Sequence, residues 1–345
     1  MKKEKSKVYF ADFSAKPGFN LLQKLKRLLI QSGIKNIDFD QKFVAVKIHF
    51  GEPGNLAYLR PNYAKVVCDL IKELGGRPFL TDCNTLYVGK RKNALDHLDA
   101  AYENGFSPFS TGCHVIIADG LKGTDEKRVP IHLDYIKEAK IGRAIMDADI
   151  FISLTHFKGH ESTGFGGAIK NIGMGCGSRA GKMEMHSSGK PFNHIEKCVG
   201  CGRCIGVCNF DAIKSPNDES NDILNRKMAE YTYAVIKDKP NFHISLITDV
   251  SPNCDCHSEN DIPIVPNIGM LASFDPVALD VACADLVNKQ EPIKHSLLAK
   301  NISKQSNIET KDHFSLAHPD TNWESAIEHA VKIGIGSNDY DLISI

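Results

Sequence analysis

The chain has 345 residues and equal numbers of basic and acidic side chains, 42 Lys plus Arg and 42 Asp plus Glu. A chain without net charge lacks the overall field that attracts nucleic acid or an anionic membrane, so we expect neither as a partner. It contains no uninterrupted apolar run of the roughly 18 residues that a membrane-spanning helix needs. Eleven cysteines without a secretory leader favour a reducing compartment and predict a cytoplasmic protein.

The first half of the chain alternates short strand patterns with amphipathic helix patterns. That order predicts an α/β fold, a mostly parallel sheet with helices on both faces. The helices are predicted from apolar residues at three- and four-residue spacing. We expect strands at 8–13, 43–50, 78–82, 115–119 and 150–154, and helices at 21–33, 61–74, 92–103 and 139–147.

The second half continues the same pattern with fewer signals. Residues 227–236 predict a helix and residues 244–250 a strand. Asp275 followed by Pro276 predicts an N-cap and a first helical turn, with the helix reaching about Asn288.

The end of the chain is harder to interpret. Residues 289–320 are polar and weakly patterned, whereas 323–333 predict a last helix and 340–345 a last strand. A cysteine-rich stretch interrupts the α/β pattern and resembles a small ferredoxin-like insert. The chain is therefore expected to divide into an α/β domain in two parts with the insert between them, at 1–181, 182–216 and 217–345.

Four cysteines of the insert follow the spacing of bacterial ferredoxins. Cys198, Cys201, Cys204 and Cys208 are separated by two, two and three residues. Two-residue gaps in a glycine-bearing loop let three thiolates reach three irons of a cubane cluster. The sequence therefore predicts one 4Fe-4S cluster. Structural zinc is the competing metal, although zinc sites usually use two well-separated Cys-x-x-Cys pairs.

The fourth ligand of this cluster is not fixed by the motif. In two-cluster ferredoxins the fourth cysteine of such a run serves the other cluster, and this chain has no second copy of the motif. The other close pair of thiols is Cys254 and Cys256, on either side of Asp255. We expect Cys254 or Cys256 to complete the site, with Cys208 as the alternative. If none of them binds, the fourth iron is open to water or substrate.

Polar residues gather where a predicted buried strand ends. His156, Lys158 and His160 follow the strand at 150–154. Ligands bind at the carboxyl edge of open α/β sheets, and alternate residues of extended backbone point to one face. Two imidazoles and an ammonium there suit an anion or a metal ion, so we predict that these three residues are catalytic. The alternative is that each histidine is simply hydrogen-bonded or solvated.

A glycine-rich stretch at 163–177 comes immediately downstream. Its glycines allow backbone N–H groups to approach an anion, and Lys170 adds a charge. We therefore predict ligand binding by Gly166, Gly167, Lys170 and Asn171. The stretch matches neither the P-loop nor the dinucleotide fingerprint, so a loop that only permits tight packing is an equal alternative.

Three blocks of the sequence, in this order, resemble the domain-of-unknown-function 362 family. They are Lys158-Gly-His160 with the glycine-rich stretch, the cysteines from 198 to 208, and residues 249–276, which include Cys254 and Cys256. The resemblance implies an α/β domain joined to ferredoxin motifs and hence cluster binding, but no particular reaction. Where members carry two cysteine motifs, the one here is similar to the second, and the first is missing.

The residues together predict an iron–sulfur redox enzyme that passes electrons to or from a small anionic substrate. His156 or His160 would supply the proton, while Lys158 and Lys170 would hold the anion. A redox protein is the expected partner. Two alternatives remain open. The protein is a non-catalytic electron-transfer or ligand-binding protein, or it is a hydratase or dehydratase in which an open iron acts as a Lewis acid.

Overall fold

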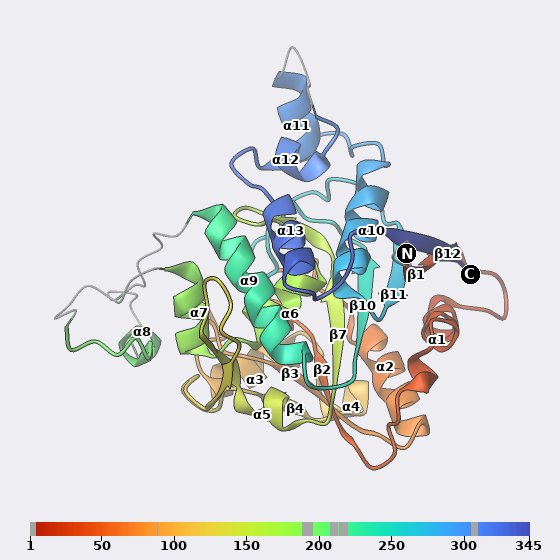
Figure 1. Ribbon diagram of the computed structural model, residues 1–345. Coiled ribbons are helices and arrows are strands. Elements are labelled where there is room, and N and C mark those ends of the chain that lie inside the picture. Colours follow the sequence, from red (N-terminus) through yellow and green to blue (C-terminus); the bar gives the residue numbers. More distant parts are fainter. Residues whose placement is uncertain (1–4, 88, 188–195, 208–212, 214–219, 305–309) are drawn as a thin grey trace.

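An eight-stranded sheet forms the centre of the computed structural model (Figure 1). The strand order is β12-β1-β11-β10-β7-β2-β3-β4, and neighbours from β10 to β4 run parallel. Only β11 opposes its neighbours within this sheet, so the expected mostly parallel α/β fold is confirmed. The structure describes residues 5–87, 89–187, 196–207, 213, 220–304 and 310–345.

The strands of this sheet are short, and the central ones are buried on both faces. In β7 every residue is buried, with Ile152 packed on one side of the sheet and Phe151 on the other. In sheet order the strands are β12 (Tyr340–Ser344), β1 (Ser6–Asp12), β11 (Gly269–Ser273), β10 (Asn241–Ile247), β7 (Ile150–His156), β2 (Phe43–Lys47), β3 (Arg77–Asp82) and β4 (Val115–Ile117).

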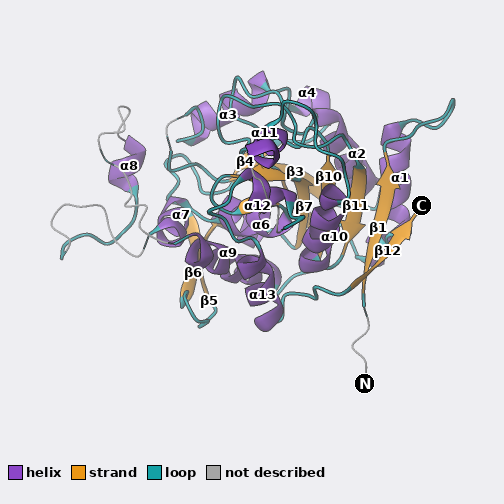
Figure 2. Ribbon diagram, turned by 90° about the horizontal axis from the view of Figure 1, so that it is seen from above, coloured by secondary structure: helices purple, strands orange, loops and turns teal. Residues whose placement is uncertain are grey.

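Helices cover both faces of the sheet (Figure 2). One face packs against α1 (Leu21–Gln31), α2 (Pro61–Glu73), α3 (Ala94–Glu103) and α4 (Pro108–Thr111). The other packs against α5 (Arg143–Asp147), α6 (Ala168–Cys176), α9 (Asn221–Ile236) and α10 (Pro276–Asn288), and α13 (Glu324–Lys332) packs on α9 and α10.

Smaller elements complete the chain. Two antiparallel hairpins lie outside the main sheet, β5 (Glu126–Pro130) with β6 (Glu138–Gly142), and β8 (Lys158–His160) with β9 (Gly164–Gly166). The remaining helices are η1 (Ile34–Asn36), α7 (Arg179–His186), α8 (Arg203–Val207), α11 (Leu297–Lys304) and α12 (His313–Ala317). In Figure 1, α8 and the cysteine loop, residues 198–204, lie beside α7, at the opposite side of the molecule from the β12 and β1 edge.

The predicted N-cap of α10 is confirmed. Asp275 Oδ1 accepts hydrogen bonds from the N–H groups of Val277 and Ala278, at 2.9 and 3.0 Å, and Pro276 opens the helix. The helix expected at 139–147 is partly wrong, because Glu138–Gly142 is strand β6 and only α5 is helical. Ala139 and Ile141 are buried on alternate positions, which is the period of a strand.

The weakly patterned region contains two helices, α11 and α12, that the sequence does not predict. Much of the predicted insert, including Cys208, lies outside the described residues, so its division from the α/β domain stays a prediction.

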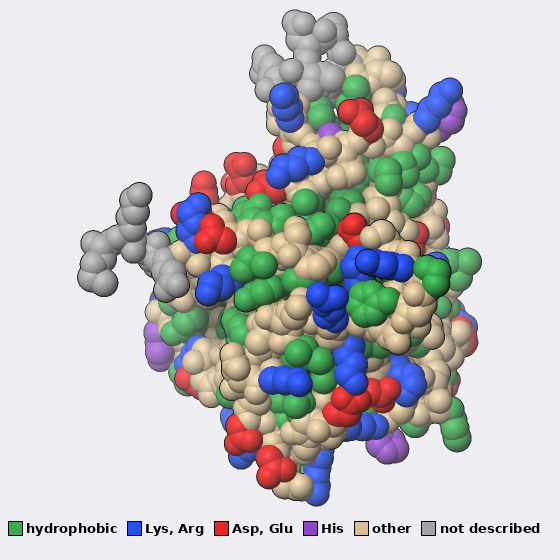
Figure 3. Space-filling model, turned by 90° about the vertical axis from the view of Figure 1, so that its right-hand side faces the viewer, with side chains coloured by type: hydrophobic (Ala, Val, Ile, Leu, Met, Phe, Trp, Pro, Cys, Tyr) green, Lys and Arg blue, Asp and Glu red, His purple; other side chains and the backbone are tan. Residues whose placement is uncertain are grey.

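Figure 3 shows basic and acidic side chains interspersed on the face that carries the β12 and β1 edge. No helix in the described part of the chain has the length and apolar character to cross a membrane.

Close packing of α6 against α9 generates the first prediction. A Cβ at Gly173 would overlap the carbonyl oxygen of Met228, which belongs to helix backbone and cannot easily move. We expect Gly173→Ala to lower the free energy of unfolding by about 1–3 kcal/mol, although alanine favours helix by ~1 kcal/mol. Urea unfolding measures the difference.

The matched control is Gly166→Ala, whose Cβ would meet the Cε atom of Lys158 at 3.3 Å, near the end of a flexible side chain. Its effect on the free energy of unfolding should be clearly smaller. If both variants lost the same free energy of unfolding, the close contact between α6 and α9 would not be the cause of the loss in Gly173→Ala.

Candidate functional site

The carboxyl ends of β2, β3 and β7 and the loop that follows β10 surround a pocket of about 280 Å³. These four strands run parallel, so their carboxyl ends meet at one edge of the sheet. The strand order changes direction between β2 and β7, and such a switch point is where open α/β sheets bind ligands. The pocket is lined by more cations than carboxylates, with Lys47, Arg91, Lys158, Lys170 and Lys182 against Asp82 and Glu161.

Asn171 joins the two strands at the switch point. Its Nδ2 donates to Thr155 Oγ1 at 3.0 Å and to Leu154 O at 3.2 Å, both from β7. Its Oδ1 accepts from the Nζ of Lys47, the last residue of β2, at 2.8 Å. Lys47 also pairs with Asp82 at 3.1 Å, with both side chains buried. Asn171, predicted as a ligand-binding residue, lines the pocket, but its side-chain amide is hydrogen-bonded to β2 and β7.

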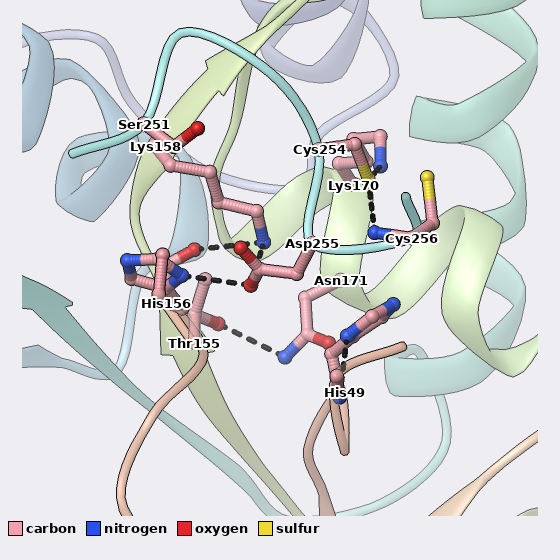
Figure 4. A network of polar contacts seen from close by, with 12 residues as sticks. His49, Thr155, His156, Lys158, Lys170, Asn171, Ser251, Cys254, Asp255 and Cys256 are labelled. Atoms are coloured by element: carbon pink, nitrogen blue, oxygen red, sulfur yellow. Dashed lines mark hydrogen bonds and ion pairs between the residues drawn. The ribbon is translucent and has the colours of Figure 1, made fainter. Parts of the chain in front are cut away.

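Asp255 is buried between the side chains of His156 and Lys158 (Figure 4). Its Oδ2 lies 2.7 Å from His156 Nδ1 and 3.2 Å from Lys158 Nζ. His156 Nε2 lies 2.6 Å from the carbonyl oxygen of Thr248, so both ring nitrogens have partners inside the protein. Burial alone would raise the pKa of Asp255, but His156 and Lys158 hold it well below its usual value.

His160 has one ring nitrogen fixed by the backbone. Its Nδ1 accepts from the N–H groups of Ser162 and Thr163, at 3.0 and 3.2 Å. The proton of the neutral ring is therefore on Nε2, which hydrogen-bonds to Cys254 in the pocket. Burial and the nearby Lys170 lower the pKa of His160, which favours this neutral form.

Cys254 is a buried thiol with several hydrogen-bond donors around it. Lys170 Nζ and the backbone N–H of Cys256 each lie 3.4 Å from its sulfur, as Figure 4 shows for Lys170. A hydrogen bond from Cys256, together with Lys170 and His160, holds the pKa of Cys254 well below its usual value despite burial. The same hydrogen bond and burial raise the pKa of Cys256. Burial would lower the pKa of Lys170, but the neighbouring sulfurs raise it.

The glycine-rich stretch positions α6 by close packing. The carboxylate of Asp280 on α10 accepts from Ala168 N and Ile169 N, at 2.6 and 2.9 Å, so these two amides at the start of α6 are occupied. A Cβ at Gly167 would overlap that carboxylate. Gly166 and Gly167 do line the pocket, but the charges that face it come from side chains. This arrangement favours the packing interpretation of the stretch.

The cysteine loop lies against the outer side of the pocket wall. Ile205 of α8 is buried in a small cluster with Leu86 and Met183, and Leu86 also lines the pocket. The loop thiols are accessible, since Cys198 and Cys201 are half-buried and Cys204 is exposed. Gly200 and Gly202 have φ near +70°, a conformation that glycine adopts without strain.

The structure separates the predicted cluster ligands into two groups. Cys254 and Cys256 line the pocket, whereas Cys198, Cys201 and Cys204 lie on the loop. Among the described residues, ligand atoms of three or more metal-binding side chains come within 4.8 Å of one another in two places. These places are Glu161 with Cys256 and His257, and Asp134 with Glu230 and His329. The loop sulfurs belong to neither, so a fourth ligand from the pocket stays a prediction.

Sequence reasoning missed several residues that line the pocket or hold its lining residues in place. Asp255 was noted only as a spacer between two cysteines, although it anchors His156 and Lys158. Arg91 was not noticed, and it pairs with Glu52 at 2.7 Å while its Nη1 lies 2.8 Å from His49. Lys47 is a charged residue at the end of an apolar strand, and this pattern is a signal in the sequence that could have identified it as a residue of the pocket. His156 is buried behind the pocket, whereas Lys158 and His160 line it.

This fold and pocket define an α/β protein with thiols and cations gathered at the carboxyl edge of its sheet. The chain belongs to the family described as Domain of unknown function (DUF362), whose model matches residues 44–285. The family resemblance found in the sequence is thereby confirmed.

Other known proteins share part of the sequence or of the fold. The thylakoid-associated protein sll1697 of Synechocystis sp. is 26% identical over 144 residues, which cover 41% of this chain and 41% of that protein. The chain thus spans about two fifths of that curated relative.

Two solved structures are similar, each with a TM-score of 0.44. The lactate racemase apoprotein from Thermoanaerobacterium thermosaccharolyticum is 14% identical, with 70% of this chain and 51% of that chain covered. A protein from Thermotoga maritima is 13% identical, with 94% and 86% covered.

Asp119, which follows β4, gives a prediction for pH dependence. Its Oδ1 accepts from Asn84 N and Nδ2, at 2.9 and 2.8 Å, while its buried Oδ2 has no partner among the described residues. Burial raises the pKa of Asp119 to about 6 from 3.8, so the folded chain holds this proton more tightly. Its contribution to stability is full below about pH 3.8 and is lost as the pH rises to about 6.

Asp119→Asn removes this titration and keeps the Oδ1 acceptor. We expect the variant to gain stability relative to the natural chain between pH 4 and pH 6, by on the order of 3 kcal/mol at most. Urea unfolding at a series of pH values tests this. The exposed Asp99→Asn is the control and should show no such pH-dependent difference. A constant difference between Asp119→Asn and the natural chain would rule out a raised pKa.

Proposed function

We propose that this protein is an iron–sulfur redox enzyme, which passes electrons to or from a small anionic substrate in the pocket. The observation that carries the proposal is the position of Leu86. This side chain lines the pocket on one side and packs against Ile205, next to Cys204, on the other. The cluster of Leu86, Met183 and Ile205 therefore connects the cysteine loop to the pocket, which supports a path for electrons between them.

The donor set of the loop fits an iron–sulfur cluster. Cys198, Cys201 and Cys204 offer three accessible thiols within one short loop, and Gly200 and Gly202 supply the left-handed turns between them. When bound, a 4Fe-4S cluster would exchange one electron at a time with a redox protein partner. The sequence leaves its fourth ligand open among Cys208, Cys254 and Cys256. Zinc is the alternative occupant.

The pocket chemistry supports a small anion as the substrate. Lys158 and Lys170 both line the pocket at the carboxyl edge of the sheet. Lys158 pairs with Asp255, whereas Lys170 faces the sulfur of Cys254 inside the pocket. Fixed cations in a pocket shielded from water attract and orient an anion more strongly than they would in solvent.

His160 is the proton donor that the geometry favours. Its Nδ1 is occupied by two backbone N–H groups, so the proton on Nε2 faces the pocket. Both nitrogens of His156 are bonded inside the protein, and we assign this histidine to positioning Asp255 instead. Reduction of a substrate by two electrons and two protons would draw the electrons singly from the redox protein partner. His160 Nε2–H would donate one proton to the substrate and regain it from solvent, which would also supply the second proton.

Anaerobic reconstitution with iron and sulfide tests the proposal. The natural chain should bind about four irons and give an EPR signal after reduction, and both should be lost in Cys201→Ser. Turnover is then followed with reduced methyl viologen and a panel of small carboxylates. His160→Gln should keep the iron and lower the rate by about 10²–10⁴-fold. The exposed His114→Gln is the matched control and should retain the full rate.

Other outcomes point to the alternatives. A reversibly reduced cluster whose spectrum no anion changes, without turnover, would make the protein an electron-transfer protein. A spectrum shifted by carboxylates without their reduction would favour hydration or dehydration at an open iron. Unchanged iron content in Cys201→Ser would remove the cysteine loop from the proposal.

A further inference from the structure

Three metal-binding side chains meet at the rim of the pocket. Ligand atoms of Glu161, Cys256 and His257 all lie within 4.8 Å of one another. Glu161 Oε1 and His257 Nε2 are 2.9 Å apart, and all three side chains line the pocket. Glu161 comes from the turn after β8, and the other two come from the loop after β10, so two separate segments of the chain converge here.

We propose that Glu161, Cys256 and His257 hold one divalent transition-metal ion, separate from the cysteine loop. This site goes beyond the redox function proposed above and does not depend on it. It also assigns Cys256 to the pocket metal, so Cys256 is unavailable as a ligand of the loop cluster.

The donor atoms favour a particular class of metal. One thiolate, one imidazole and one carboxylate suit zinc and neighbouring metals such as cobalt(II) and iron(II), whereas magnesium and calcium prefer oxygen ligands alone. The carboxylate and the thiolate together balance the two charges of the ion. Three protein ligands leave a fourth position open, as in catalytic zinc sites.

The open position suits a small anion. All three ligands line the pocket that also contains Lys158 and Lys170, so a carboxylate bound to the metal would meet an ammonium group on its other side. A neighbouring group also holds one of the ligands. The backbone N–H of Cys256 donates to Cys254 Sγ at 3.4 Å. Such outer partners help to fix ligand orientation in metal sites.

The second group of metal-binding side chains shows what a purely structural group looks like. Glu230 is fully buried, and its oxygens already accept from Tyr135 N, Ile136 N and His329 Nε2. Asp134 is exposed and pairs with Lys332 at 2.7 Å. That group does not line the pocket described above, so it supplies the control.

Cobalt(II) binding tests the proposal without any assay of turnover. The protein used has Cys198, Cys201, Cys204 and Cys208 all replaced by serine, so no loop cluster forms. We expect one cobalt ion per chain, with thiolate-to-cobalt charge-transfer absorption. Cys256→Ser in this background should abolish that absorption. His257→Gln and Glu161→Gln should each weaken binding by more than the roughly 10–100-fold that loss of an outer-shell partner costs.

Asp134→Asn is the matched control and should leave cobalt binding unchanged. Circular dichroism verifies folding, and the two substitutions of exposed rim side chains, Glu161 and His257, provide the readout if Cys256→Ser misfolds. Failure of the loop-free protein to bind stoichiometric cobalt overturns the proposal, as does charge-transfer absorption that survives in a folded Cys256→Ser variant. Neither result bears on iron binding by the cysteine loop.

Discussion

A buried carboxylate between a histidine and a lysine is the interaction on which the pocket depends. Asp255 ties the loop after β10 to His156 at the end of β7 and to Lys158 in β8. The same loop carries Cys254 and Cys256, so the position of both thiols follows from this one anchor. Removing one member of such a buried group typically costs about 3–5 kcal/mol, because its partner is left as an uncompensated charge. The charge needed to attract an anion is thus also what holds the site together.

Glycines make the second constraint, by letting backbone segments approach one another closely. A Cβ at Gly159 would overlap the carbonyl oxygen of Pro252, and one at Gly175 would overlap the Lys47 side chain. The first contact brings β8 against the loop after β10, and the second brings α6 against β2. The glycine-rich stretch therefore acts on the pocket indirectly. It positions the elements from which Lys158, Lys170 and the cysteines project.

The sequence predicts the α/β class and most of the central elements because buried strands and amphipathic helices leave strong local patterns. It also places Lys158 and His160 at the carboxyl edge of the sheet, through the rule that open α/β sheets bind ligands where their strands end. The helix expected at 139–147 failed because residues 138–142 pair with β5, just upstream in the same hairpin, and their short alternation of buried residues was read as part of a helix. Asp255 was missed for a different reason, since its role comes from partners about 100 residues away. Long-range pairing of this kind leaves no local periodicity.

β1 and β12, the first and last strands along the chain, pair with each other in the sheet. Ser6 lies opposite Tyr340, and Val8 lies opposite Leu342. Both ends of the chain consequently emerge on the side of the molecule away from α8 (Figures 1 and 2). A tag placed at either end would attach the protein to an electrode through the edge at β12. The cysteine loop would then face the solution, where a soluble electron donor can reach it.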